Sequence, residues 1–509
     1  MQERGAERLA LPAVMAGEQP YATPQVLGLF LKSMESTSFV GNLVRSFRAG
    51  VVFFFVAAIS PAFAQSASLE LLYNWTNPNF APSTVFANTY NECWGFVQDG
   101  KEYGVIGTSW GTHIFDLSDP ENIRPVDSVQ GAYSGPGVIH RDFEDYHGYL
   151  YAVCDEGSGI STLQIMDLRY LPDSVSVVYD SKDLLSLTHN IAIDTVYGRL
   201  YCFLVGFAPG FSSLAIYDLA DPENPALMAI YNDGTLVHDG YVRDHILYMS
   251  DGYNGRILVM DWTDTDNPVV LGSIDSYPDR GYNHSGWLHD TEPIFVFADE
   301  NHGALMKVLD VSDLTDINVL STFGSEVDPM SIVHNPVFRG DYLFSACYHD
   351  GLYIHDLSDP TNPTYVAHYK TYVPTDHTSY RGAWGVYPRL PSGLIIVSDM
   401  QFGMFVFRAN GLGLGQEVVP PSFQVTGVSP NPFADRVSVQ VHAQEAVKGR
   451  IFLSDMQGRV VRERTLNLVP GANNLDWELG ADLATGLYVL RLESGAAQFS
   501  EQLVKLGRD

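Results

Sequence analysis

Short apolar runs alternate with polar turn residues along most of the chain. Runs such as GRLYCFLVG (198–206) and GLIIVSD (393–399) are rich in aromatic and branched side chains and are bounded by Gly, Asp or Asn. This pattern is typical of β-strands joined by tight turns. Few stretches repeat apolar residues at the period of a helix. The pattern therefore predicts an all-β fold class.

One phrase recurs along the first four hundred residues. Clear copies are HIFDLSDPENIRPV (113–126), LAIYDLADPENPALM (214–228), ILVMDWTDTDNPVVL (257–271) and LYIHDLSDPTNPTYV (352–366), with looser copies at 163–177 and 306–320. Each copy reads as a strand, a turn built on Asp and Pro, and a second strand. Two further apolar runs precede each copy. Four strands in roughly 45 to 50 residues is the content of one propeller blade.

The number of units follows from the first strand of each. Aligning these strands equates Trp94, His140, His189, His238, His284, His334 and Trp384. Seven equivalent positions predict a seven-bladed β-propeller over residues 65–410. The seventh unit supplies only three strands. The strand-like segment LELLYNWTNP, which begins at Leu69, precedes the first unit and belongs to none of the seven. We therefore expect strand 69–75 to close blade seven, because closure removes an open sheet edge.

The segments that flank the propeller differ from it. Arg45 and Arg48 precede an apolar stretch at 51–59, which is too short to cross a bilayer, and Ala62-Phe63-Ala64 follows as a cleavage site. This predicts a signal peptide at 34–64, with residues 1–33 as an over-long N-terminal extension. A Gly- and Pro-rich linker is expected at 411–422, before a module of short alternating strands at 423–509. That module reads as a small C-terminal β-sandwich.

Two parts of the chain carry motifs that resemble those of known families. SPNPFADRVSV, LSDMQGRVV and LATGLYVLRL resemble the type A sorting domain of the type IX secretion system of Bacteroidetes. The DLSDPxNP phrases and GAWGVYPRLPSGLIIVSDMQFGMFVF resemble the choice-of-anchor B family with its LVIVP-type repeats. The first resemblance implies delivery by the type IX secretion machinery to the cell surface or medium of a Gram-negative bacterium. The second brings no activity with it.

Composition narrows the range of partners. The formal charge of −31 comes from 60 acidic and 29 basic residues spread along the chain. An acidic surface disfavours nucleic acid and anionic lipid as partners. Beyond the signal segment no run is apolar enough for a transmembrane span, and the mature chain is expected to be monomeric. Four cysteines lie in apolar runs without ligand spacing, which favours buried free thiols.

The repeated histidines are the sharpest chemical feature, and two interpretations of them compete. Inner strands line a propeller channel, so His140, His189, His238, His284 and His334 could bind a divalent metal ion as a cofactor. A carboxylate follows most of these positions by 13 to 16 residues, whereas blade three has Gly206 near that place. A His to Asp hydrogen bond within each blade would make both groups structural. We favour the structural interpretation.

Candidates for a ligand face lie in loops and at the two tryptophan positions. They are Trp94, Asp299, Glu300, His302, His377, Arg381 and Trp384. Two other motifs are better explained as turns: GTSWG (107–111) matches a nucleophile elbow but precedes no helix, and DWTDTD (261–266) lacks the Gly and Glu of a calcium loop.

No catalytic set stands out from the repeat. The sequence therefore favours a non-catalytic binding or interaction module for a protein, glycan or small-molecule ligand. The alternative is a hydrolase or lyase, metal-dependent or not, at the channel mouth.

Overall fold

The computed structural model describes residues 67–207, 210–232, 236–415, 423–443, 446–456, 459–480, 482–494 and 497–507. The predicted extension at 1–33, the signal peptide at 34–64 and residues 416–422 of the predicted linker lie outside the described residues. In the part that is described, no helix is long and apolar enough to cross a bilayer.

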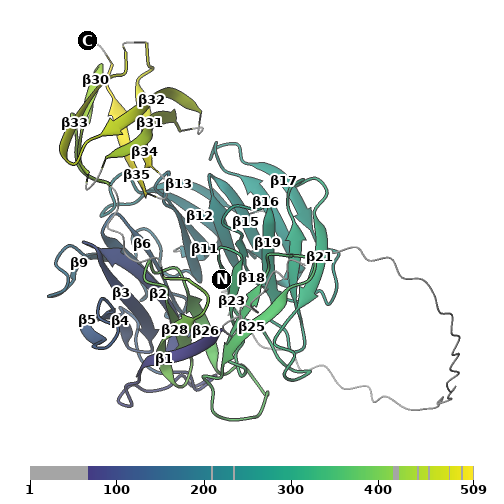
Figure 1. Cartoon of the computed structure of the whole chain (residues 1–509). Coiled ribbons are helices and arrows are strands. Elements are labelled where there is room, and N and C mark those ends of the chain that lie inside the picture. Colours follow the sequence, from purple (N-terminus) through teal and green to yellow (C-terminus); the bar gives the residue numbers. More distant parts are fainter. Residues whose placement is uncertain are drawn as a thin grey trace, which may run out of the picture. The chain divides into compact units, whose positions relative to one another are not determined.

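Seven antiparallel sheets of four strands form the larger part of the molecule (Figure 1). The first strand of each sheet contacts the first strands of the two neighbouring sheets, in the closed circle β2, β6, β10, β14, β18, β22 and β26. The first strands are therefore innermost and surround a central channel. This arrangement confirms the predicted seven-bladed propeller.

The strands of the first three sheets are β2 (Tyr90–Gln98), β3 (Lys101–Thr108), β4 (Gly111–Asp116) and β5 (Arg124–Gln130); β6 (Arg141–Tyr146), β7 (Tyr149–Cys154), β8 (Leu163–Asp167) and β9 (Ser176–Ser181); and β10 (Asn190–Asp194), β11 (Arg199–Phe207), β12 (Gly210–Asp218) and β13 (Ala226–Tyr231). The fourth comprises β14 (Asp239–Arg243), β15 (Ile246–Asp251), β16 (Arg256–Asp261) and β17 (Val269–Ile274), with the short 3-10 helix η1 (Gly252–Asn254) between β15 and β16. The fifth and sixth comprise β18 (Asn283–Leu288), β19 (Ile294–Asp299), β20 (Met306–Asp310) and β21 (Asn318–Phe323); and β22 (Pro336–Arg339), β23 (Tyr342–Ala346), β24 (Leu352–Asp356) and β25 (Thr364–Tyr369).

The seventh sheet joins the two ends of the propeller sequence. Its inner strands are β26 (Ala383–Tyr387), β27 (Leu394–Asp399) and β28 (Gly403–Asn410), and its outermost strand is β1 (Ser68–Trp75). β1 runs antiparallel to β28 from the pair Ser68 and Asn410 to the pair Trp75 and Met404. The backbone groups along the outer side of β28 are therefore paired by a segment more than 300 residues away in sequence.

The repeated Asp and Pro phrase forms the turn between the third and fourth strands of a blade. In blade one the Asp116 carboxylate accepts a hydrogen bond from the backbone N–H of Ser118, and Asp119 accepts one from Glu121. Blade six repeats both contacts through Asp356 and Asp359. These Asx turns confirm the turn chemistry read from the sequence.

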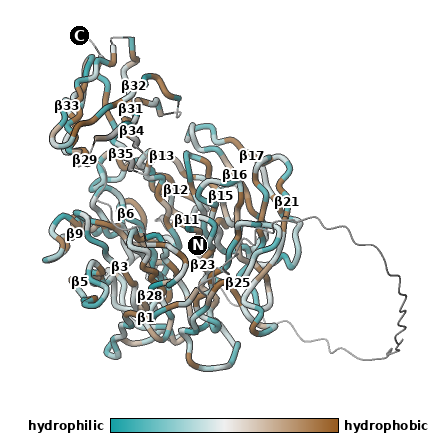
Figure 2. The backbone as a smooth tube through the Cα atoms, viewed as in Figure 1, coloured by the Kyte–Doolittle hydropathy of each residue, from teal (hydrophilic) through white to brown (hydrophobic). Residues whose placement is uncertain are grey.

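Burial follows the position of the strand within a blade. The second and third strands are almost wholly buried, whereas outermost strands such as β5 are largely exposed. Connecting segments at the edge of the propeller are mostly hydrophilic (Figure 2). The four cysteines are all buried and unpaired, as the apolar runs around them predicted.

The C-terminal module is a sandwich of two antiparallel sheets. One contains β29 (Phe423–Ser429), β30 (Arg436–Ala443) and β33 (Gly471–Glu478), and the other contains β32 (Val460–Leu468), β31 (Val447–Asp455), β34 (Gly486–Ser494) and β35 (Ala497–Lys505). The module has its own core, which includes Phe433, Val439, Leu453 and Leu490. The structure thus confirms a small β-sandwich after the propeller.

Trp75 provides a test of how much β1 stabilises the propeller. Its indole packs against Tyr90, His113 and Phe115 of blade one, with ring centroids 5.0 to 5.9 Å apart. We expect Trp75→Ala to lower the free energy of unfolding by about 2 kcal/mol, somewhat less than for a fully buried aromatic side chain. Leu71→Ala is the matched control, because Leu71 lies on the same strand and is 38% exposed. Urea denaturation of the two variants giving equal losses would contradict this role for β1.

Candidate metal and ligand site in the central channel

Five imidazoles and one indole form a continuous ring around the channel axis. His140, His189, His238, His284 and His334 follow one another with centroids 4.2 to 4.3 Å apart. Trp384 closes the ring, at 4.6 Å from His334 and 5.7 Å from His140. All six side chains are buried or nearly so. We refer to these six residues as the histidine ring.

Trp94 is not a member of this ring, which corrects the sequence alignment in blade one. In blade seven, Trp384 lies in a β-bulge between the pairs Ala383 with Asp399 and Val386 with Val397. Blade one has the same irregularity between Tyr90 with Thr108 and Cys93 with Ile106. The residue equivalent to Trp384 is therefore Asn91. An alignment by residue type cannot detect this three-residue offset, because a bulge changes which side chains face the axis.

The predicted histidine to aspartate bond within each blade does not occur. His189 Nδ1 donates to Asp155 Oδ2 of the preceding blade over 2.7 Å. His238 Nδ1 donates to the backbone oxygen of His284 over 3.0 Å, and His334 Nδ1 donates to that of Trp384 over 2.8 Å. The ring histidines thus connect neighbouring blades. The absence of a blade-three carboxylate near Gly206 is irrelevant, since His189 uses Asp155 of blade two.

The other turn carboxylates have partners of their own. Asp299, a predicted ligand-face residue, forms a fully buried ion pair with Lys307 over 2.7 Å. Asp399 accepts a hydrogen bond from Thr371, and Asp251 pairs with Arg256. These groups stabilise their own loops and are not available to a ligand.

Burial keeps most of the ring uncharged. It lowers the pKa of His334 to about 3 and the pKa values of His140, His238 and His284 well below the usual range. Burial acts in the same direction on His189, but the Asp155 carboxylate outweighs it and the pKa of His189 is raised. Three neutral imidazoles, those of His238, His284 and His334, therefore lie side by side, each with a lone pair on one ring nitrogen, and His140 is separated from them by His189.

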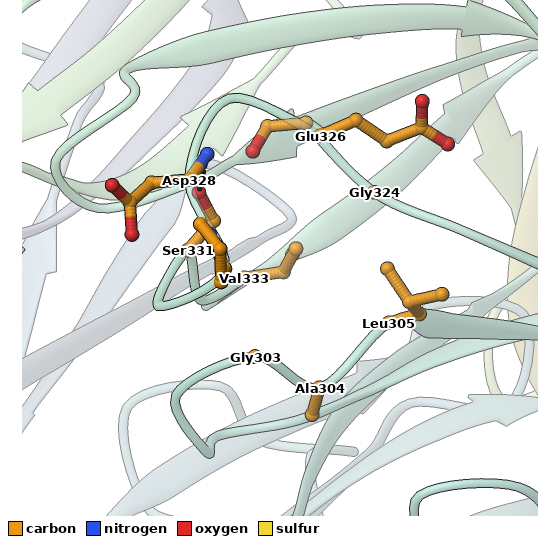
Figure 3. A pocket seen from close by; sticks show the side chains of 10 residues that line it. Gly303, Ala304, Leu305, Gly324, Glu326, Asp328, Ser331 and Val333 are labelled. Carbon is orange, nitrogen blue, oxygen red and sulfur yellow. Dashed lines mark hydrogen bonds between the residues drawn. The ribbon is translucent and has the colours of Figure 1, made fainter. Parts of the chain in front are cut away.

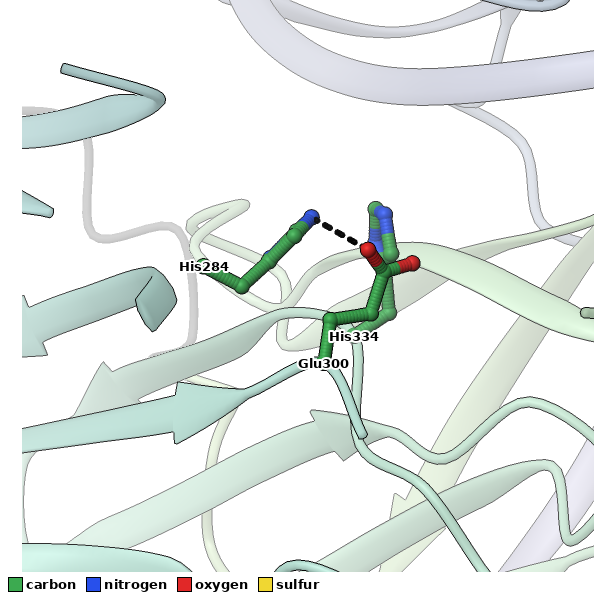
Figure 4. A group of neighbouring side chains, drawn as sticks. All are labelled: His284, Glu300 and His334. Atoms are coloured by element: carbon green, nitrogen blue, oxygen red, sulfur yellow. Dashed lines mark ion pairs between the residues drawn. The ribbon is translucent and has the colours of Figure 1, made fainter. Parts of the chain in front are cut away.

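Glu300 joins two of these imidazoles. Its carboxylate and the rings of His284 and His334 point toward one another (Figure 4), with one potential ligand atom from each within 4.8 Å of the others. Glu300 Oε2 lies 3.9 Å from His284 Nε2, and the hydroxyl of Tyr348 donates to Glu300 Oε1. Burial raises the pKa of Glu300 to about 7. Two of the five predicted metal candidates and one predicted ligand-face residue thus come together.

The remaining loop candidates lie to the side of this group. His377 Nε2 hydrogen bonds to Asp350 over 2.7 Å, and His302 Nδ1 donates to the backbone oxygen of Met330 over 2.8 Å. The Arg381 guanidinium lies close enough to Tyr372 to offset part of the rise in the pKa of that phenol, whose largest cause is burial. A pocket of about 280 Å³ lies between residues 303–305 and the loop 324–331 (Figure 3). His302 and His377 therefore fix loops beside this pocket and do not join the histidine ring.

The sequence motifs that resemble nucleophile sites behave as turns or core. The Ser109 hydroxyl of GTSWG donates to the backbone oxygen of Ala81, over 2.7 Å. Burial raises the pKa values of the Cys154 and Cys202 thiols, to about 12 for Cys154. A thiol of raised pKa is a poor nucleophile at neutral pH.

A cavity of about 800 Å³ occupies the channel on the side of the ring where the inner strands end. Seven acidic residues line it, and four of them, Glu92, Asp142, Glu144 and Asp239, lie on the inner strands β2, β6 and β14. The same lining includes Arg243, Arg389 and Arg491. Burial raises the pKa of Asp142 to about 7 and that of Asp239 to about 6, and it raises those of Glu92 and Glu144 well above the usual range. Sequence reasoning missed this cluster, which we call the channel carboxyls. Its signal was an acidic residue one to four positions after a ring position, as in HRDFE (140–144) and HD (238–239).

Aromatic side chains also line this cavity. Trp94 and Tyr387 have ring centroids 4.7 Å apart, and Tyr241 and Trp287 have theirs 5.0 Å apart. The indole N–H of Trp94 donates to Asp145 over 2.9 Å. Trp94, predicted to lie on a ligand face, is thus part of the cavity wall.

Comparison with known proteins assigns two parts of the chain. The family model described as the LVIVD repeat matches residues 337–371, which lie in the sixth sheet. The model described as the secretion system C-terminal sorting domain matches residues 427–506. The chain contains an LVIVD repeat and a C-terminal sorting domain. Both matches confirm the resemblances found in the sequence.

Solved structures show similarity at low identity. One is PorZ of Porphyromonas gingivalis, described as an essential bacterial surface component of the type-IX secretion system. It is 12% identical with a TM-score of 0.43, and the match covers 85% of this chain and 61% of PorZ. Another is Raptor of Chaetomium thermophilum, at 15% identity and a TM-score of 0.37, covering 52% of this chain and 23% of Raptor. No curated protein matches the chain.

The sorting domain specifies where the protein is delivered. A domain of this type indicates secretion by the type IX system to the outer surface of a Gram-negative bacterium. The LVIVD-repeat propeller is therefore the exported part whose function has to be explained.

The bond between His189 and Asp155 has a predictable pH dependence. The pKa of His189 is raised in the folded state, so its contribution to stability is full below the ordinary imidazole value of about 6.5 and is lost as pH rises through the raised value. We expect His189→Gln to cost about 1 to 3 kcal/mol at pH 5.5 and less at pH 9, in urea titrations. Asp155→Asn should show the same pH-dependent loss in the free energy of unfolding. A loss that does not change with pH in either variant would contradict the bond between His189 and Asp155 as its cause.

Proposed function

We propose that this exported propeller is a non-catalytic binding module that holds a cationic organic ligand in its channel cavity. The observation that carries this proposal is the set of channel carboxyls. Among the described residues, none of the four forms a salt bridge with Lys, Arg or His. Carboxyl groups that are buried or half-buried without an ion-pair partner are costly to ionise, and burial is the largest cause of their raised pKa values.

The environment of each carboxyl supports a role in binding. Glu92 accepts hydrogen bonds from Asn335 and from the backbone of Cys93, and Asp142 accepts one from the backbone of Ile191. Glu144 has no hydrogen-bonding group among the causes of its pKa shift. Glu144 is therefore the carboxyl with most capacity for a new partner.

The aromatic residues that line the cavity also favour a cationic organic ligand. Ammonium and guanidinium groups are attracted to the faces of indole and phenol rings. The cavity already displays this interaction, since Arg243 lies over the ring of Tyr241 and Arg389 lies over that of Trp287. Carboxyl groups and aromatic rings in one lining fit a primary amine or guanidinium on a slender carbon chain.

The alternative, a hydrolase or lyase at the channel mouth, has less support. Its nucleophile candidates are occupied or inactive, because Ser109 donates to a backbone oxygen and the cysteine thiols are buried. Perturbed carboxyls and imidazoles do also occur in active sites. Turnover of an ester, glycoside or peptide by the purified protein would favour the enzyme over the binding module.

Spermidine is a suitable probe of the channel. Because an amine binds the ionised carboxyls, we expect binding at pH 8 and a loss of at least tenfold in affinity at pH 5.5, below the raised pKa values of Asp142 and Asp239. Calorimetric titration of the mature chain should also detect proton release on binding. Glu144→Gln should weaken binding at pH 8.

Glu326→Gln is the matched control, since Glu326 is exposed and lies outside the cavity. Equal affinity of the Glu144→Gln and Glu326→Gln proteins for spermidine would refute the channel as the binding site. Absence of binding by the wild type at pH 8 would refute the ligand class.

A further inference from the structure

We infer that the histidine ring holds a divalent transition metal ion of the zinc class, coordinated by His284, Glu300 and His334. This inference extends the proposed binding function to a second ligand on the same axis, and it rests on different residues from the channel carboxyls. Two imidazoles and one carboxylate are a common protein ligand set for zinc, with the remaining position open to water or a ligand.

The hydrogen bonds of the ring prepare its nitrogens for a metal. A backbone oxygen can only accept, so the Nδ1 of His334 carries the proton that it donates to Trp384, and its Nε2 keeps the lone pair. His238 is fixed in the same way by the backbone oxygen of His284. Histidines that ligate metals characteristically donate their other N–H to a carbonyl or carboxylate.

His284 supplies the second observation that points to a missing partner. Its side chain is 2% exposed, and its Nδ1 has no hydrogen-bond partner among the described residues. The nearest contact of its Nε2 is Glu300 Oε2 at 3.9 Å, which is too long for a hydrogen bond. Because no described residue accepts from or donates to Nδ1, the protein does not fix which nitrogen of His284 carries the proton, and Nδ1 can carry it while Nε2, which faces Glu300, offers its lone pair to a cation.

Glu300 is held as a ligand would be. Tyr348 donates to one carboxylate oxygen and leaves the other directed at His284.

The distances require only a small adjustment. The three potential ligand atoms lie within 4.8 Å of one another. Metal bonds of about 2.0 to 2.2 Å would bring them to roughly 3.3 Å apart. Each pair of ligand atoms therefore has to approach by at most about 1.5 Å, through movement of the Glu300 side chain and of the two imidazoles.

The test uses the mature chain after dialysis against a chelator. We expect one equivalent of Zn²⁺ to bind by calorimetry at pH 7.5 and to raise Tm, and Co²⁺ to give the visible absorption of a four- or five-coordinate site. His284→Gln and Glu300→Gln should each reduce affinity at least tenfold. Tyr348→Phe should reduce it about tenfold, because it removes only the hydrogen bond that orients Glu300.

His368→Ala is the matched control, since His368 is exposed on the outermost strand β25. A wild-type protein that binds no Zn²⁺ and gives no Co²⁺ absorption would overturn the inference. So would metal binding that is unchanged in both Glu300→Gln and His284→Gln, or that is lost equally in His368→Ala. If a glutamine variant fails to fold by circular dichroism, the Tyr348→Phe result decides.

The metal site and the amine-binding cavity can be refuted independently of each other. Glu144→Gln should leave the affinity for Zn²⁺ unchanged, and His284→Gln should leave that for spermidine unchanged. Loss of Zn²⁺ binding in Glu144→Gln with full retention in His284→Gln would place the metal among the channel carboxyls and refute the site proposed here.

Discussion

Closure of the ring by the pairing of β1 with β28 is the interaction on which the rest of the structure depends. A blade is a four-stranded sheet that buries both faces only when it has a neighbour on each side. The contact that completes the circle joins residues 68–75 to residues 404–410. Because the circle is complete, seven first strands share one axis, and side chains separated by some fifty residues in sequence become neighbours.

The axis concentrates two kinds of ionisable group, and burial drives both toward their neutral forms. Imidazoles lose their proton at lower pH than usual, whereas carboxyl groups keep theirs to higher pH. The two effects have the same cause, since a low-dielectric interior disfavours charge of either sign. A cation entering the channel would change the protonation of the groups around it.

Much of the fold could be predicted from the sequence because its information is local and repeated. The phrase around Asp116 and its copies encodes an Asx turn that needs no distant partner, and its spacing gives the number of blades. The orphan strand that begins at Leu69 could be inferred because one unit lacked its fourth strand. These arguments use only strand length, turn chemistry and counting.

The candidate site was harder to predict because it depends on contacts between blades. The residue types of the histidine ring were evident, but their partners were not, since His189 reaches Asp155 of the preceding blade and two others use backbone oxygens. The prediction that Trp94 is equivalent to the ring histidines was wrong, because the bulge in β2 shifts the register of that strand. Asp239 was missed because a strand residue next to an inward-facing histidine is expected to face outward, and Glu92 was missed because the sequence alignment placed Trp94 at the ring position of blade one.

The glycine at position 385 illustrates how closely the first and last blades are matched. A Cβ atom at Gly385 would lie 1.6 Å from Oε1 of Glu92, so the carboxylate of one blade fills the space that a side chain of the other would need. Neither residue can be exchanged freely while the other remains. Among descendants of this sequence, a larger residue at 385 should therefore occur only with a smaller one at 92, which makes these distant positions an expected pair of co-varying sites.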